Sequence, residues 1–337
     1  MENKQIIDIS TSTILRFILI ILGIFFLYLI RDILLMLFVA VVIAAAIDGP
    51  VDWLERHKVR RFFGTAILYI FLFLLVAFFL YLVLPPLAGQ LKILANNLPD
   101  LLEKLGAGFS IVGYKVKGLD FQVILQNLSG QLAGATTNVF GTAVNIFGGI
   151  FNFVVILVIS IYLVAQDKSL KEFLAGLVPE KHQAYTANLV ERIKDKLGAW
   201  LRGQLIVMFI LGLLSFIGLT ILNVKYALTI SLLAALFEIV PYVGPILSGA
   251  AGMMIALVQS PILALLVLAL FVVIHQLEGN IIAPQVMRRA VGLNPLTVII
   301  ALIIGGKVAG ILGILISVPL ATIISLILKD FFSAKET

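Results

Sequence analysis

The chain alternates long apolar runs with short polar segments, a pattern typical of a membrane protein that crosses the bilayer several times. About 20 apolar residues in a helix span roughly 30 Å of hydrocarbon. We therefore predict an all-α, polytopic fold with about eight membrane segments. The predicted spans are 14–30, 33–47, 62–84, 146–165 and 205–222, followed by less regular stretches at 226–258, 262–275 and 297–328.

The first irregular stretch is too long for one straight span. The 33 residues of 226–258 would form a helix of about 50 Å. Pro241, Gly244 and Pro245 lie in its middle, and proline removes a backbone donor and clashes with the preceding turn. The helix must therefore break, either as a hairpin or as one long, tilted span. The distribution of basic residues favours the hairpin.

The stretch 297–328 has a similar interruption, made by Gly305, Gly306 and Gly310 and then Pro319. These glycines suit either a hinge or the close packing of two helices. Two broken segments in one half of a chain are typical of transporters, where broken helices line the binding site.

Charge is scarce in this half of the chain. Between 204 and 328 the only acidic residues are Glu238 and Glu278, each within a polar or helix-breaking patch. A carboxylate and an open backbone at bilayer depth are both costly unless they line protein or water. We therefore expect a translocation path formed by Glu238, Pro241, Tyr242, Gly244, Pro245, Gln276, Glu278, Asn280, Pro284 and Lys307.

Several of these residues also have structural interpretations. Glu238 could cap a half-helix or pair with Lys307, and Glu278 could be interfacial. Tyr242 could line the path or lie at the interface, and His275 could be a hydrogen-bonded helix residue or a proton relay. We expect Pro284 to end its helix.

Basic residues gather in 48–61 and 166–203, which places both segments and both termini in the cytoplasm. The predicted organisation has five parts. They are N-terminal membrane helices (1–84), an extracytoplasmic amphipathic insertion (85–145), a membrane helix (146–165), a cytoplasmic loop with an amphipathic helix over 179–202 (166–203), and the C-terminal membrane region with the transport site (204–328).

Composition narrows the possible chemistry. The chain is 61% hydrophobic and 12% charged, and its net charge of +6 comes from residues in the loops, so we do not expect a nucleic-acid partner. It has no cysteine and three scattered histidines, so we expect no metal and no cofactor. It also lacks zinc-protease, nucleophile-elbow and phosphate-binding-loop motifs, so we expect neither an enzyme nor an ATP-driven motor.

Four motifs together resemble the autoinducer-2 exporter family, the PerM-like permeases. They are Glu-Ile-Val-Pro-Tyr-Val-Gly-Pro at 238–245, Gln-Leu-Glu-Gly-Asn at 276–280 with Pro284, Val-Gly-Leu-Asn-Pro at 291–295, and Gly-Gly-Lys-Val-Ala-Gly-Ile-Leu-Gly at 305–313 followed by Val-Pro at 318–319. The resemblance covers most of the chain and implies an exporter in the bacterial cytoplasmic membrane. It also implies a homo-oligomer, with a pentamer as the expected form.

The resemblance implies a small polar solute, with the quorum-sensing signal autoinducer-2 as the candidate. Arg288, Asn294 and Lys307 depart from the residues we expect for the family, and Lys307 near the path would suit an anionic or polar solute. Two other functions stay open at this point: a monovalent cation/proton antiporter, and a membrane scaffold that transports nothing.

Overall fold

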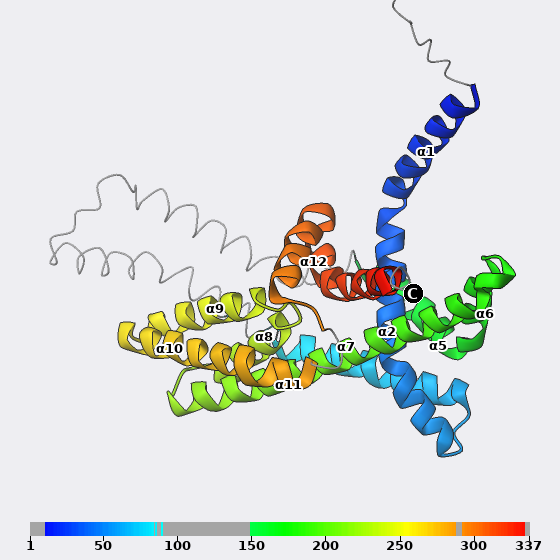
Figure 1. The fold of residues 1–337 in the computed structure, drawn as a ribbon. Helices are drawn as coiled ribbons and strands as arrows, with labels where there is room; N and C mark the ends of the chain where they lie inside the picture. The colour runs from blue at the N-terminus through cyan, green and yellow to red at the C-terminus, as the bar shows by residue number, and fades with distance from the viewer. Residues whose placement is uncertain (1–10, 84, 86–88, 90–148, 288–291, 334–337) are drawn as a thin grey trace, which may run out of the picture.

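The computed structural model describes residues 11–83, 85, 89, 149–287 and 292–333, and in these ranges the regular structure is entirely helical (Figure 1). Five helices in the described part are long and apolar enough to cross a membrane: Arg31–Arg56, Arg61–Val83, Glu180–Ile221, Pro261–Met287 and Pro295–Phe332. The prediction of an all-α, polytopic membrane protein is confirmed. The predicted insertion at 85–145 and the pair Arg288 and Arg289 lie outside the described residues, apart from positions 85 and 89.

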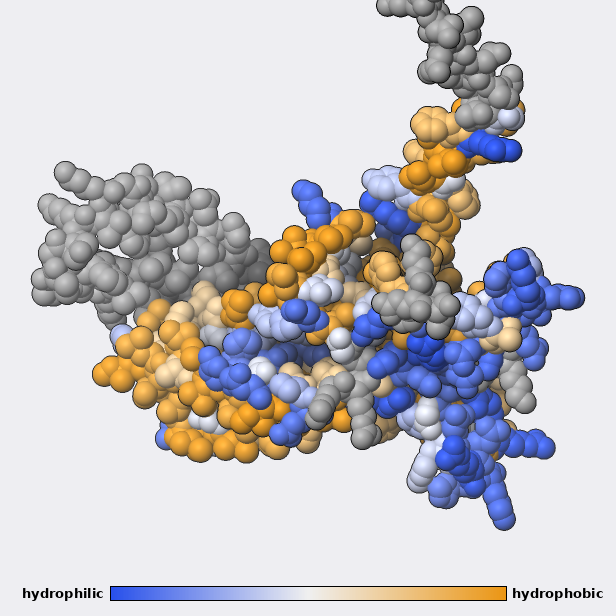
Figure 2. All heavy atoms as spheres, viewed as in Figure 1, coloured by the Kyte–Doolittle hydropathy of each residue, from blue (hydrophilic) through white to orange (hydrophobic). Residues whose placement is uncertain are grey.

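Apolar side chains cover much of the outer surface, as expected for helices that face lipid. In Figure 2 they cover α9 and α10, whereas polar residues gather around α6, the start of α7 and the end of α2. Most apolar side chains of α1 (Thr11–Leu29) are exposed, Phe17 at 66% for example, and this helix projects away from the remaining helices (Figure 1).

The N-terminal helices are held together by a partly buried ionic network centred on Asp48. In α2 (Arg31–Arg56), Asp48 accepts hydrogen bonds from Arg61, at the start of the helix Arg61–Val83, and from Lys194 at 2.6 Å. Arg61 also donates to Asp52 at 2.6 Å and to the backbone oxygen of Val164 in α5 (Ile150–Ala165) at 2.9 Å. These contacts explain why α2 continues through residues 48–56, which the sequence analysis placed in a loop: the charged residues find partners on neighbouring helices.

The cytoplasmic segment also differs from the prediction. After α6 (Asp167–Gly176), one continuous helix, α7 (Glu180–Ile221), runs for 42 residues, about 63 Å. It combines the amphipathic helix predicted over 179–202 with the span predicted over 205–222, because no proline interrupts the helix between them. Helix α7 therefore contacts both the N-terminal helices and the C-terminal half (Figure 1).

The C-terminal half is built from helices that fold back on one another. Helices α8 (Ala227–Phe237) and α9 (Val243–Gln259) pack together across a short turn, and α9 packs on α10 (Pro261–Leu277). A π-helical turn, η1 (Glu278–Ile282), and the short helix α11 (Ala283–Met287) continue α10.

The last element, α12 (Pro295–Ser333), also folds back on itself. It bends at Ala309 and Gly310, and Gly310 has a φ of 59°. A Cβ on Gly305 would overlap the carbonyl of Gly313 and the hydroxyl of Ser317, so the two halves of α12 touch through their backbones. Both long irregular stretches are therefore hairpins rather than single tilted helices.

Candidate functional site

A pocket of about 440 Å³ lies where α7, the α8–α9 turn, η1 and the start of α12 meet. Seven of the predicted translocation residues line this pocket: Glu238, Pro241, Tyr242, Gln276, Glu278, Asn280 and Pro284. They come from two separate segments of the sequence. The fold thus brings together the two polar patches that the sequence analysis selected.

The turn between α8 and α9 brings Glu238 into the pocket. Helix α8 ends at Phe237, and Tyr242 enters α9 with a φ of 66°, a left-handed conformation rare outside glycine. Gly244 is required here, because a Cβ would lie 2.5 Å from the carbonyl oxygen of Phe237. Pro245 lies in the first turn of α9, where its missing N–H costs no helical hydrogen bond. Gly244 and Pro245 therefore shape the turn without lining the pocket.

Two buried carboxyl groups face each other in the pocket. Glu238 is 2% exposed and Glu278 is 6% exposed, and both side chains line this pocket. An ionised carboxylate only accepts hydrogen bonds, so a bond between the two groups requires a proton on one of them. Nδ1 of His275 lies 2.9 Å from Oε2 of Glu278. Among the described residues, Oε1 of Glu238 has no hydrogen-bond partner.

The π-helical turn accounts for the position of Pro284. The Ala283 N–H bonds to the Glu278 carbonyl, five residues back, in the wider ring of a π-helix. Pro284 follows directly, and the helix continues to Met287, so the prediction that Pro284 ends this element is wrong. The wider turn accommodates a residue with no N–H to donate. Within the turn, Nδ2 of Asn280 donates to Oε1 of Gln276, in the last turn of α10, at 2.9 Å.

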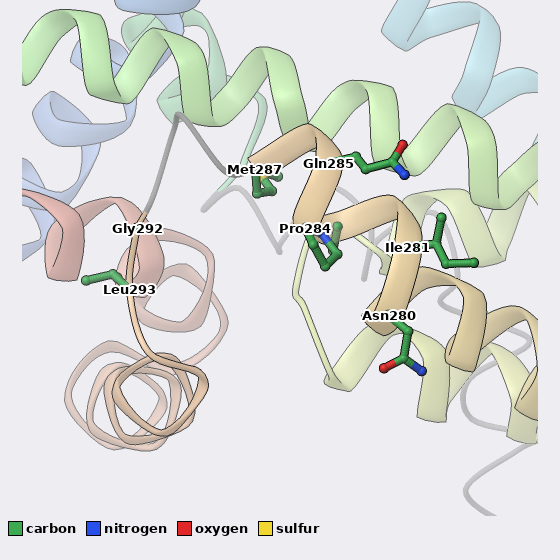
Figure 3. A pocket seen from close by; sticks show the side chains of 8 residues that line it. Asn280, Ile281, Pro284, Gln285, Met287, Gly292 and Leu293 are labelled. Carbon is green, nitrogen blue, oxygen red and sulfur yellow. The ribbon is translucent and has the colours of Figure 1, made fainter.

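A second hollow of about 610 Å³ adjoins this pocket. Asn280 and Pro284, which line the first pocket, lie on one side of it, and Gly292 and Leu293, just before α12, lie on the other (Figure 3). The two hollows share lining residues, so they are adjacent, on either side of α11 and the segment before α12.

The predicted residues of α12 lie outside the pocket. Lys307 is exposed and makes no ion pair with any residue in the described ranges, so pairing with Glu238 does not occur there. Gly305 packs against Gly313, and Gly306 lies close to Ile314, which a Cβ would approach to 3.1 Å. Gly310 provides the positive φ of the bend. These glycines form the hairpin itself.

Helix α7 forms one wall of the pocket, and its residues were not among those predicted from the sequence. Trp200, Gln204 and Val207 line it from one face of this helix, and all three are buried. Nε2 of Gln204 donates a hydrogen bond to the backbone carbonyl of Glu238. Their spacing of four and three residues could have revealed a buried helix face, but the segment up to 203 was interpreted as a cytoplasmic loop.

Apolar outward surfaces, hairpins of broken helices and a buried polar pocket are together typical of a polytopic membrane transporter. The chain belongs to the AI-2E transporter family, whose sequence model matches residues 17–333. The resemblance inferred from the four motifs is thereby confirmed.

Individual relatives support the same assignment. The chain is 28% identical to YueF of Bacillus subtilis (strain 168), over 85% of this chain and 80% of that protein. It is 26% identical to the AI-2 transport protein TqsA of Escherichia coli (strain K12), over 88% of this chain and 84% of TqsA.

Proposed function

We propose that this chain is a secondary transporter that exports a small polar solute across the bacterial cytoplasmic membrane. The observation that carries the proposal is the facing pair Glu238 and Glu278 in a pocket of about 440 Å³. Carboxyl groups buried between helices at membrane depth are typical of substrate and ion pathways. The sequence has no phosphate-binding loop, which favours transport driven by an ion gradient.

The lining of the pocket favours a neutral or cationic solute. Its polar side chains are carboxyls, amides, an indole, a phenol and an imidazole, and no lysine or arginine is among its described lining residues. Since Lys307 is exposed and lies outside this lining, it gives no support to an anionic solute. The similarity to the AI-2 transport protein TqsA supports autoinducer-2 as the first solute to test.

In this proposal the carboxyl pair also carries the coupling proton. A proton shared by Glu238 and Glu278 would be released from the pair when a solute forms hydrogen bonds with the two carboxyl groups. Access would alternate through movement of the region 204–328 relative to the first four spans, with the α8–α9 and α12 hairpins as moving parts. Both termini would lie in the cytoplasm, and the chain would work as a homo-oligomer, with a pentamer as the form to test.

A monovalent cation/proton antiporter is the alternative that a specific observation favours. Two carboxyl groups that line one pocket, Glu238 and Glu278, offer hard oxygen ligands to a cation. The scaffold alternative requires polar patches sealed in subunit contacts, and a pocket lined by these patches weighs against it.

The test is flux through purified protein in liposomes under a proton gradient. Autoinducer-2, sodium and potassium are offered in parallel. Glu238→Gln keeps the shape of the side chain and removes its charge, so we expect it to abolish proton-coupled flux while exchange at equal pH persists. Glu172→Gln, on the exposed surface of α6, is the matched control. Flux of sodium or potassium alone would select the antiporter, and unchanged flux in Glu238→Gln would remove Glu238 from the mechanism.

A further inference from the structure

Gln204 occupies an unusual position for an amide side chain in a membrane helix. It is 1% exposed, it lines the pocket from α7, and it lies on the same helix face as Trp200 and Val207. A polar side chain buried in this environment needs a partner. Its Nε2 finds one in the backbone carbonyl of Glu238, 34 residues further along the chain.

The carbonyl of Glu238 needs a donor because helix α8 ends there. The last four carbonyls of a helix have no intrahelical partner. In the turn that follows, the N–H groups of Val240 and Gly244 bond to the carbonyls of Phe237 and Val240 instead. The Gln204 amide thus caps the end of α8 from another helix.

The same turn of α7 also contacts the opposite wall of the pocket. A Cβ on Gly203 would lie 3.1 Å from Sδ of Met287 and 3.4 Å from Cγ1 of Val286, so α11 packs directly on this glycine. Helix α11 continues the segment that carries Glu278. Residues 203 and 204 of α7 therefore contact both the segment that carries Glu238 and the segment that carries Glu278.

We propose that Gln204 is a positioning residue, whose amide holds the backbone of Glu238 so that the carboxyl group faces Glu278 and the pocket. This inference rests on the proposed function in assigning the pocket to solute. Gln204 acts through Glu238, by fixing the end of α8.

The first experiment uses substitutions at Gln204 that differ in their ability to donate a hydrogen bond. Gln204→Leu keeps the volume and loses the donor, so solute affinity in liposomes should fall by roughly tenfold. Gln204→Glu can donate only when its carboxyl group is protonated. Its transport should therefore approach that of the wild type at low pH and fall to that of Gln204→Leu at high pH.

Four other titratable side chains line the pocket: Glu238 from the end of α8, Tyr242 from the α8–α9 turn, Glu278 from η1 and His275 from α10. These groups are present in the wild type and in both variants. Comparison of the Gln204→Glu profile with the Gln204→Leu profile therefore removes their contribution to the pH dependence. A merely structural role for Gln204 would lower transport in both variants at every pH. Equal pH profiles for Gln204→Glu and Gln204→Leu would overturn the inference.

The second experiment does not depend on the solute. The chain has no cysteine, so Tyr242→Cys introduces one thiol at the α8–α9 turn, where Tyr242 lines the pocket and is 37% exposed. We expect its rate of reaction with N-ethylmaleimide in membranes to change about fivefold when Gln204→Leu is added. Ser215→Ala, a buried position of α7 outside the pocket lining, is the control and should leave the rate unchanged.

The two experiments separate the possible failures. If the wild type moves no solute but the Tyr242→Cys rate responds to Gln204→Leu, the positioning role stands and the transport assignment fails. If the wild type transports and neither the labelling rate nor the pH profile responds, the positioning role fails. Should Gln204→Leu not fold, Gln204→Met, which also has no side-chain N–H and is similar in length to glutamine, replaces it in both measurements.

Discussion

Two glycine-to-alanine substitutions, one at the crossing of α2 and α7 and one in α9, should change the stability of the protein in opposite directions. A Cβ on Gly198 would overlap the carbonyl oxygen of Ala45 and lie 3.0 Å from Nη1 of Arg202. A Cβ on Gly249, in α9, would instead lie 3.5 Å from the nearest atom of Phe271, an ordinary van der Waals contact. Both glycines are inside helices, so the substitutions differ in the space around them and not in local backbone conformation.

The magnitudes follow from two opposing effects. Alanine favours a helix over glycine by about 1 kcal/mol. Nothing opposes this gain at Gly249, so Gly249→Ala should stabilise the protein by up to about 1 kcal/mol. At Gly198 the new methyl group meets backbone atoms that cannot rotate away, and overpacking of this kind costs about 1–3 kcal/mol. Since the overlap is with backbone, the upper part of that range applies, and Gly198→Ala should destabilise the protein by about 1–2 kcal/mol after the helix gain is subtracted.

The assay is unfolding of the purified protein in mixed micelles with an increasing fraction of SDS, followed by tryptophan fluorescence. The chain has two tryptophans, and Trp200 is 4% exposed beside the crossing, whereas Trp53 is 59% exposed. The emission of Trp200 should therefore report the separation of α2 from α7. The reasoning is refuted if Gly198→Ala is as stable as the wild type, or if Gly249→Ala loses more stability than Gly198→Ala.

Three further substitutions test other parts of the structure. Asp48→Asn removes the charge that Arg61 and Lys194 share at a side chain that is 10% exposed, and should cost ~1.5–3 kcal/mol in the same unfolding assay. Tyr69→Phe removes a buried hydroxyl that bonds to α5 and leaves its partner unpaired, so unfolding should become easier by about 1–2 kcal/mol. Lys307→Gln should leave flux and solute preference unchanged in liposomes, because Lys307 is exposed outside the pocket; altered selectivity would contradict this placement.

The importance of the two carboxyl groups and of the helix breaks could be predicted from the sequence. The free energy that a charged side chain or an open backbone costs in the bilayer depends on its depth there and not on its neighbours in the fold. A reader of the sequence needs no coordinates to see that Glu238 and Glu278 must be buried in protein or near water. Pro241 fixes the position of the first break by removing a backbone donor. The contact between the two patches could not be predicted, since it depends on how α8, α9 and α10 pack.

The wall formed by α7 was not predicted, although the spacing of its residues indicates a buried helix face, because the chain changes there from amphipathic to apolar without a break. Charged residues up to Arg202 indicate the cytoplasm, and the apolar run from Leu205 indicates a span. Gln204 lies at the boundary between these two segments, where a polar residue is expected at the membrane surface and does not indicate a buried site. Two contacts in the folded chain place this boundary at the pocket. Gly203 packs on α11, and Gln204 bonds to the end of α8.

Lys307 was predicted to line the translocation path because it lies near a predicted helix break, but it lies outside the pocket. Once the two halves of α12 fold together, Gly305 and Gly313 must face each other, because a side chain at either position would overlap the other half. Lys307 follows Gly305 by two residues, which turns its side chain about 200° around the helix axis and away from the contact. The hairpin therefore places Lys307 on the outside.

Three costly features coincide at the pocket, and their coincidence argues for a solute rather than for a scaffold. Tyr242 holds a left-handed backbone conformation, Oε1 of Glu238 is buried with no described partner, and a π-helical turn begins at Glu278. A scaffold could replace these groups with apolar side chains of similar shape and gain stability, since an unpaired buried polar atom costs about 1–3 kcal/mol. Strained backbone and π-helical turns are concentrated at functional sites. The coincidence of all three in one pocket therefore supports the proposal that this pocket binds a solute.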